Sequence, residues 1–258
     1  MNTSIPNGQA TGLFGKLPAH GDFIHRSLPT KLVNEWDAWL QTFIGSTQER
    51  LGEAWLEIYL TSPIWRFCLS PGTLDSSAWA GVVLPSVDRV GRYFPFSVLR
   101  KLPDTTSLAV FITQQQSWYE AIEALALKAL DGQLPVDRLM DELNRLRLRP
   151  QDSYVSQAAA KLDAGVVVDL DFDQPAPATA LPHLLDAFVA STFTSYSYWS
   201  TNGSDRVEPC IFITPGMPPA AGGGALLDGL WEHWEWSVPV RPLRGSAPDI
   251  AAPDAGAL

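Results

Sequence analysis

The sequence has little that would support metal chemistry, a cross-linked fold or a membrane span. Its 258 residues include two cysteines, Cys68 and Cys210, and four histidines. Two distant cysteines outside a CxxC motif form no disulfide framework, so we expect buried free thiols in a reducing compartment. No stretch approaches the roughly 18 consecutive apolar residues that a membrane span needs. Residues 1–10 also lack a signal-peptide pattern, so we expect a cytoplasmic protein without direct membrane insertion.

Basic charge is scarce as well. The chain has 18 Lys and Arg against 28 Asp and Glu, a net charge of −10. Residues 1–101 contain nine basic and eight acidic side chains, whereas residues 102–258 contain nine and twenty, so the acidity lies in the second part. A chain with this balance is repelled by nucleic acid phosphates and anionic membranes, so we exclude nucleic acid as a partner.

The pattern of apolar residues predicts one α/β domain over residues 12–242, with a flexible leader at 1–11 and a disordered tail at 243–258. Strands in short runs, helices in blocks and no regular βαβ alternation favour a mixed or mostly antiparallel sheet covered by helices. We expect strands at 64–69, 79–84, 94–99, 108–113, 164–170, 195–200, 210–214 and 236–240. We expect helices from 29 to a stop at Gly45, from a capping box at Ser46 and Glu49, and over about 115–131, 136–147 and 181–190.

Candidate chemistry is weak. Gly15-Lys16 lacks the other residues of a phosphate-binding loop. His20, Asp22 and His25 lie close in sequence, but a zinc site needs further ligands from well-placed elements, and none stand near. Ser86 and Asp88 suggest a nucleophile and its orienter, yet the sequence pairs Ser86 with no base and lacks the Gly-x-Ser-x-Gly elbow. We therefore expect no cofactor, no metal, no small-molecule substrate and no enzymatic activity. A hydrolase using Ser86 and Asp88 is the alternative.

Four ordered blocks over residues 12–100 resemble the TagF (ImpM) family. The first is GLFGKLPAHGDFIHR at residues 12–26, and the second is WDAWL at 36–40. The third is PIWRF at 63–67, and the fourth runs from Trp79 to Phe96 and includes LPSVDRVGRYFPF. The runs YSYWS at 196–200 and LLDG at 226–229 are similar to the later part of the family.

The resemblance implies an accessory protein of the bacterial type VI secretion system. TagF-like proteins act as post-translational repressors of assembly, associated with a forkhead-associated (FHA) scaffold protein, and their fold is an α/β sandwich, of which a longin-like or profilin-like sheet is one form. A structural subunit of the apparatus is the second alternative. The candidate motif and interface residues are Lys16, Asp22, Arg26, Trp36, Trp65, Arg66, Ser86, Asp88, Arg89 and Arg92.

Complementary charges in two of these blocks suggest a mechanism for the motif residues. Asp22 lies in the first block, and Asp88, Arg89 and Arg92 lie in the fourth. We expect ion pairs among them that tie the glycine-rich turn to the turn between two strands. The simpler interpretation is that these pairs hold the fold and contact no partner. Interface anchors are often Trp, Tyr and Arg, and the chain has ten Trp, but the sequence alone does not say which are exposed.

Overall fold

A computed structural model describes residues 11–150, 165–170 and 176–241. A single seven-stranded sheet with the order β2-β1-β5-β4-β3-β6-β7 runs through it, and every neighbouring pair is antiparallel. This confirms the antiparallel option of the predicted α/β fold. The strands are β1 (Thr11–Gly15), β2 (Ile24–Arg26), β3 (Trp65–Leu69), β4 (Trp79–Leu84), β5 (Phe96–Lys101), β6 (Tyr196–Thr201) and β7 (Cys210–Pro215).

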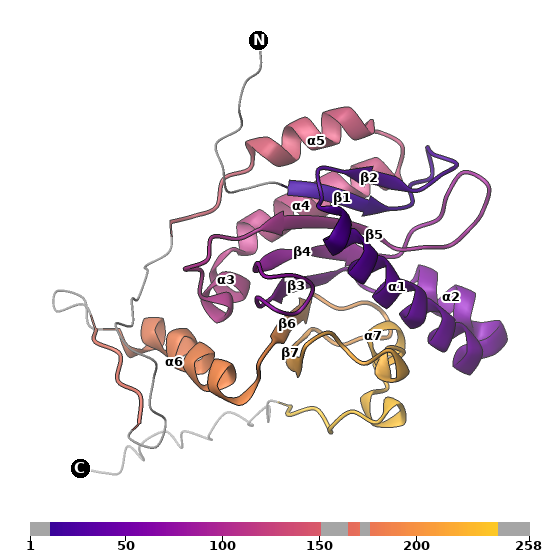
Figure 1. Ribbon diagram of the computed structural model, residues 1–258. Coiled ribbons are helices and arrows are strands. Elements are labelled where there is room, and N and C mark those ends of the chain that lie inside the picture. The colour runs from indigo at the N-terminus through magenta and orange to yellow at the C-terminus, as the bar shows by residue number, and fades with distance from the viewer. Residues whose placement is uncertain (1–10, 151–164, 171–175, 242–258) are drawn as a thin grey trace, which may run out of the picture.

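Helices cover both faces of the sheet (Figure 1). The helices α3, α4 and α5 supply one apolar layer, and α1, α2 and α7 supply the other. No helix in the described ranges is both long and apolar enough to cross a bilayer. The helices are α1 (Thr30–Leu51), α2 (Trp55–Leu60), α3 (Leu108–Gln114), α4 (Gln116–Leu130), α5 (Val136–Arg145), α6 (Pro177–Thr192) and α7 (Ala225–Asp228), with short 3-10 turns at Gly52–Ala54, Ala220–Gly222 and Trp231–Trp234.

The side chains of alternate residues along the central strands form two hydrophobic cores, one on each face of the sheet. In β3, Phe67 packs toward the α1 side, whereas the next residue, Cys68, packs toward α4. The α1 side is dominated by tryptophan: Trp36 and Trp199 are fully buried with parallel rings 6.5 Å apart, and both contact Phe67. Side chains of alternate residues point to opposite sides of a strand, so each central strand contributes to both cores. The helices on the two sides bury both faces of the sheet.

Several predicted elements are wrong. Residues 108–113 form helix α3, which Ser107 caps by accepting a hydrogen bond from the Val110 backbone N–H. Gly45 does not end a helix, because α1 continues to Leu51. The capping box is absent too: the Ser46 hydroxyl donates to the carbonyl of Ala220 instead. An exposed helical glycine costs only about 1 kcal/mol, and the buried residues Phe43, Ile44 and Thr47 outweigh that cost.

Two further predicted strands fail in the described residues. Residues 165–170 and 236–240 contain no strand, and Ala164 lies outside the described residues. The leader prediction is wrong at Thr11, which is buried in β1, and its other residues lie outside the described ranges, as does the predicted tail. Both thiols are free, but only Cys68 is fully buried, because Cys210 begins an edge strand and is half-buried.

A candidate interaction site at the loop tip

Two loops meet at one end of the sheet and form what we call the loop tip, residues 16–26 and 85–95. The first follows β1 and includes β2, and the second joins β4 to β5. Gly15, at the base of the first loop, has φ +127°, and a Cβ there would lie 2.0 Å from the carbonyl oxygen of Pro95. Only glycine permits this close approach of the two loops.

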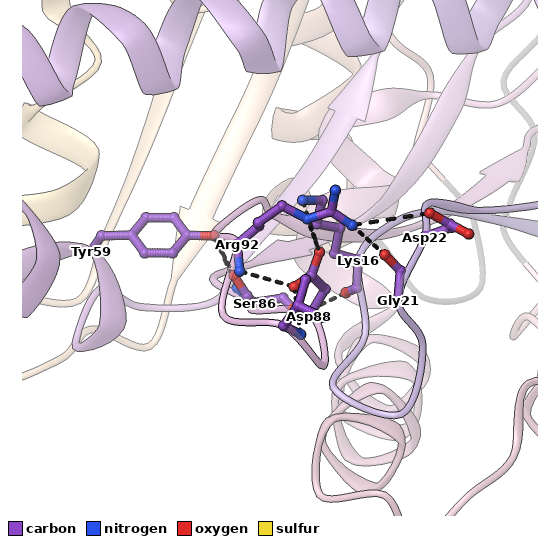
Figure 2. A network of polar contacts seen from close by, with 8 residues as sticks. Lys16, Gly21, Asp22, Tyr59, Ser86, Asp88 and Arg92 are labelled. Carbon is purple, nitrogen blue, oxygen red and sulfur yellow. Dashed lines mark hydrogen bonds and ion pairs between the residues drawn. The ribbon is translucent and has the colours of Figure 1, made fainter.

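The carboxylate of Asp88 is the centre of the loop tip, and Figure 2 shows the network around it. Its Oδ1 accepts from the backbone N–H groups of Val90 and Arg92 at 3.0 and 2.9 Å. Its Oδ2 lies 2.6 Å from Nε of Arg92 and 3.1 Å from Nζ of Lys16. The side chain of Asp88 is fully buried, and that of Lys16 is 7% exposed. The loop from Asp88 to Arg92 is therefore folded around its own carboxylate.

The hydrogen bonds control the pKa of Asp88. Burial alone would raise this pKa, but the bonds from Arg92, Lys16 and Val90 outweigh burial and hold it well below its usual range. The side chain is therefore a carboxylate at neutral pH. A carboxylate with this many donors has its oxygen lone pairs occupied by the protein, so it acts as a structural anchor rather than as a proton carrier.

Ser86 fixes the other side of the same loop. Its hydroxyl donates to the carbonyl of Lys16 at 2.7 Å, and its backbone N–H donates to the hydroxyl of Tyr59 at 2.9 Å. The Tyr59 hydroxyl in turn donates to the Ser86 carbonyl at 3.1 Å, and burial raises the pKa of Tyr59 above its usual value. Helix α2 is thereby tied to the loop tip. The geometry argues against the hydrolase alternative, because the Ser86 hydroxyl is buried and its proton is committed to a carbonyl.

The second loop also holds the first. The backbone N–H of Arg89 donates to the carbonyl of His20 at 3.0 Å, and the guanidinium of Arg92 donates to the carbonyl of Gly21. Arg92 reaches Asp22 only at 4.0 Å, where both side chains are exposed, so this pair is weak.

Of the expected ion pairs, Arg92–Asp88 lies within the fourth block, and only the weak Arg92–Asp22 pair joins the two blocks. The close ion pair between the blocks is Lys16–Asp88. Among the ion pairs of the described residues, the Arg89 side chain takes part in none.

The outer surface of the loop tip combines apolar and basic groups. Phe23 is 49% exposed and Val90 is 66% exposed. The Phe23 ring stacks on Phe14 and meets Phe94 edge-on at 4.8 Å, so its position is fixed. The exposed guanidinium groups belong to Arg26, Arg89 and Arg92. Sequence reasoning missed Phe23 and Val90, because an exposed apolar residue beside buried ones gives no periodic signal.

Comparison with known proteins gives the family. The TagF N-terminal domain family, described as type VI secretion system-associated, matches residues 12–146, more than half of the chain. Among solved structures, PA0076 from Pseudomonas aeruginosa PAO1, a crystal structure at 2.05 Å resolution, superposes with a TM-score of 0.74 at 34% identity and covers 93% of this chain and 100% of its own. The chain belongs to the TagF family. No curated protein matches it. This TagF chain is thus a type VI secretion-associated accessory protein, and the family is not a known enzyme family.

The ten candidate residues all lie within the matched TagF region, yet they divide into three sets. Trp36, Trp65 and Arg66 are buried within the folded chain, so they present almost no surface to a partner. The indole N–H groups of Trp36 and Trp65 donate to Ser97 and to the Leu226 carbonyl, respectively. The Arg66 guanidinium makes two hydrogen bonds to Glu123, at 2.6 and 2.9 Å. The second set, Lys16, Ser86 and Asp88, is buried and holds the two loops of this TagF chain together. The third set is exposed and consists of Asp22, Arg26, Arg89 and Arg92.

Metal binding finds no support in the described part of this TagF chain. No three side chains of His, Cys, Asp or Glu there are close enough to hold an ion. The Nε2–H of His25 donates to the carbonyl of Leu28 at 2.9 Å, which makes His25 part of the turn after β2. The acidic run that follows Asp169 lies outside the described residues.

Proposed function

We propose that this chain is a cytoplasmic, non-enzymatic negative regulator of type VI secretion that binds an FHA-domain scaffold protein of the system through the loop tip. The family association with type VI secretion supports the first part of the proposal. The second part rests on the chemistry of the loop tip and on the resemblance described above.

The observation that supports the proposal best is the contrast between the buried base and the exposed surface of the loop tip. Lys16, Ser86 and Asp88 form a buried hydrogen-bonded base, and Phe23, Val90 and the arginines project from it. Arginine and aromatic side chains dominate the binding energy of protein interfaces. Because the base fixes the loop before a partner arrives, little conformational entropy is lost on binding.

Charge favours an acidic partner surface at this end of the molecule. Three exposed arginines lie on the loop tip of a chain whose net charge is −10. Arg89 is the group most available to a partner among the three, since its guanidinium takes part in no ion pair of the described residues. By contrast, Arg92 is paired with Asp88, and Arg26 donates to the His25 carbonyl. An acidic surface would be attracted to the loop tip and repelled by the acidic second part of the chain, which would orient the encounter.

The test is calorimetric titration of the full chain into the scaffold protein from the same gene cluster. We expect saturable binding of the unaltered chain, and an affinity at least about tenfold weaker for Arg89→Ala, which corresponds to about 1.4 kcal/mol. Arg138→Ala is the matched control, because Arg138 is an exposed arginine on α5, outside the two loops that form the loop tip. Equal affinities for the two variants would exclude the loop tip as the binding surface.

Deletion of the gene separates regulation from the alternative of a structural subunit. A negative regulator predicts more secretion when it is absent, whereas a structural subunit predicts that secretion is lost. Complementation with Arg89→Ala would reproduce the deletion phenotype if the loop tip is required, and complementation with Arg138→Ala would restore the normal level. Loss of secretion on deletion would overturn the proposal.

A further inference from the structure

The two edges of the sheet differ in a way that bears on self-association. The edge strand β2 has three residues, of which His25 and Arg26 are exposed. At the opposite edge, β7 has six residues with the sequence CIFITP, none of them charged, and it pairs only with β6 in the described part of the chain. Charged side chains, prolines and short length are the usual protections of an edge strand against pairing with another chain, and β7 has only the proline at its end, Pro215.

The hydrogen-bond pattern shows which backbone groups of β7 point outward. The N–H of Gly216, directly after β7, donates to the carbonyl of Ser195 at 2.9 Å. In an antiparallel pair, alternate residues bond to the neighbouring strand, so Thr214 and Phe212 direct their N–H and C=O toward β6. The N–H and C=O groups of Ile211 and Ile213 consequently point away from the sheet.

The surface beside this edge is apolar and uncharged. Ile211 is 55% exposed, and Leu181 and Leu185 on α6 are 60% and 42% exposed. They line a groove with a volume of about 350 Å³ between α6, α3 and the end of the sheet, with Tyr198 among its lining residues. Scattered exposed apolar residues are ordinary, but a contiguous group beside an open strand edge indicates an interaction surface.

Helix α6 adds no exposed acid and no Lys or Arg to this surface, and its one histidine, His183, is half-buried. The helix contains no Lys, Arg or Glu. Its one acid, Asp186, is directed inward, where it accepts from the Tyr198 hydroxyl at 2.8 Å and from the Ala109 N–H at 3.1 Å. In a chain with a net charge of −10, two copies repel each other over most of their surfaces. Among the residues of β7 and α6, no exposed side chain is an Asp, Glu, Lys or Arg that would repel a second copy.

We propose that β7 pairs antiparallel with β7 of a second copy of this chain, which makes one sheet continuous across a two-fold axis. An axis at Phe212 sets Ile211 of one copy opposite Ile213 of the other. The outward N–H and C=O groups of these residues then bond to each other in both directions, as a self-complementary interface requires. The same axis brings the apolar residues of α6 in each copy toward Ile211 of the other. This proposal concerns the edge opposite the loop tip and does not depend on the proposed function.

Sedimentation equilibrium of the full chain over a wide range of concentrations tests the proposal. We expect a concentration-dependent rise to twice the chain mass of 28.2 kDa. Ile211→Lys puts a charge on the edge strand, and it is expected to raise the dissociation constant of the dimer at least about tenfold. Leu181→Lys on α6 is a second variant at a more exposed position, in case Ile211→Lys perturbs the strand. Val90→Lys is the matched control, because Val90 is also an exposed aliphatic residue but lies at the loop tip.

Amide hydrogen exchange distinguishes strand pairing from other contacts. The amides of Ile211 and Ile213 are expected to exchange more slowly at concentrations where the dimer forms, and Ile211→Lys is expected to remove the effect at Ile213. A chain that stays monomeric at all concentrations would overturn the proposal, and an extended peptide from another protein would then be the better occupant of the edge. A dimer that Ile211→Lys and Leu181→Lys leave intact would also overturn it.

Discussion

Asp88 shows how one buried side chain can organise an exposed surface. Its carboxylate accepts from two backbone N–H groups of its own loop, from Arg92 and from Lys16 in the other loop. A buried carboxylate is tolerated only when such donors compensate its desolvation. The same bonds hold the exposed Arg89 and Val90 in one arrangement. The residues that bind a partner in our proposal are thus positioned by residues that the partner does not touch.

Replacement of Asp88 is expected to make the free energy of unfolding depend less on pH in the acid range. Because the folded-state pKa of Asp88 lies below its ordinary value of 3.8, its contribution is fully present above that value and is lost as the pH falls below it. Asp88→Asn should therefore lower the free energy of unfolding at neutral pH, and the gap to the unaltered chain should narrow below about pH 4. Urea unfolding of both proteins across this range measures the gap.

Asp22→Asn is the control for this prediction. Its side chain is fully exposed and lies 4.0 Å from Arg92, so its removal should change the free energy of unfolding little at any pH. The contrary result is a difference in the free energy of unfolding between Asp88→Asn and the unaltered chain that stays constant from neutral pH to pH 3. That result would show that Asp88 does not stabilise the fold as a carboxylate.

The candidate site was only partly predictable at the level of residues. Complementary charge in two polar loops predicted the contact between the first and fourth blocks, and Arg92 makes it. The role of Lys16 was not predictable, because its partner Asp88 is 72 residues away and nothing local marks the pair. Trp36 and Trp65 were candidates for an interface because tryptophan suits both cores and surfaces, and burial decides between the two only in the folded chain.

Two glycines, one inside α1 and one directly after it, supply a prediction for this element. Gly45 is exposed within the continuous helix, and a Cβ there would have no atom within 4 Å. Gly52 ends the helix with φ +54°. Gly45→Ala is expected to raise the free energy of unfolding by about 0.5–1 kcal/mol. Gly52→Ala is expected to lower it by about 1–3 kcal/mol, because L residues rarely adopt that conformation.

The two alanine variants are controls for each other, since they make the same chemical change seven positions apart, once inside α1 and once directly after its end. Thermal and urea unfolding measure both. If Gly45 ended a helix, as its sequence context suggested, Gly45→Ala would destabilise the chain as Gly52→Ala does. A destabilised Gly45→Ala variant would therefore show that α1 is broken at that position.

The strands and most helices were predictable because their apolar patterns are periodic and bounded by turns. The strands at β3, β4, β6 and β7 were located to within a residue or two. The run from Leu108 to Ile112 was assigned to a strand because all five residues are apolar, and all five are buried in α3. A short run that is buried on every side lacks the periodicity that separates helix from strand. The Ser107 cap was the signal that could have corrected it.

The whole molecule depends on contacts between its first and last parts. The interior strand β3 pairs with β4 on one side and with β6 on the other. Trp199 of β6 is fully buried against Trp36 and Phe67, and the indole of Trp65 donates to the Leu226 carbonyl. Residues that follow the matched TagF N-terminal region therefore complete the sheet and one of its two cores.

A chain that ends at residue 146 is consequently expected not to fold cooperatively. It would expose the edge of β3 and remove Trp199 from the centre of the tryptophan core, where large aromatic truncations alone cost about 3–5 kcal/mol. The full chain should unfold in one transition that tryptophan fluorescence and far-ultraviolet circular dichroism report together. A chain that ends at Arg241 keeps every described residue and should match the full chain. A cooperative transition in the shorter chain would mean that the residues up to 146 form a domain of their own, and that the sheet beyond β3 is an addition to it rather than part of its core.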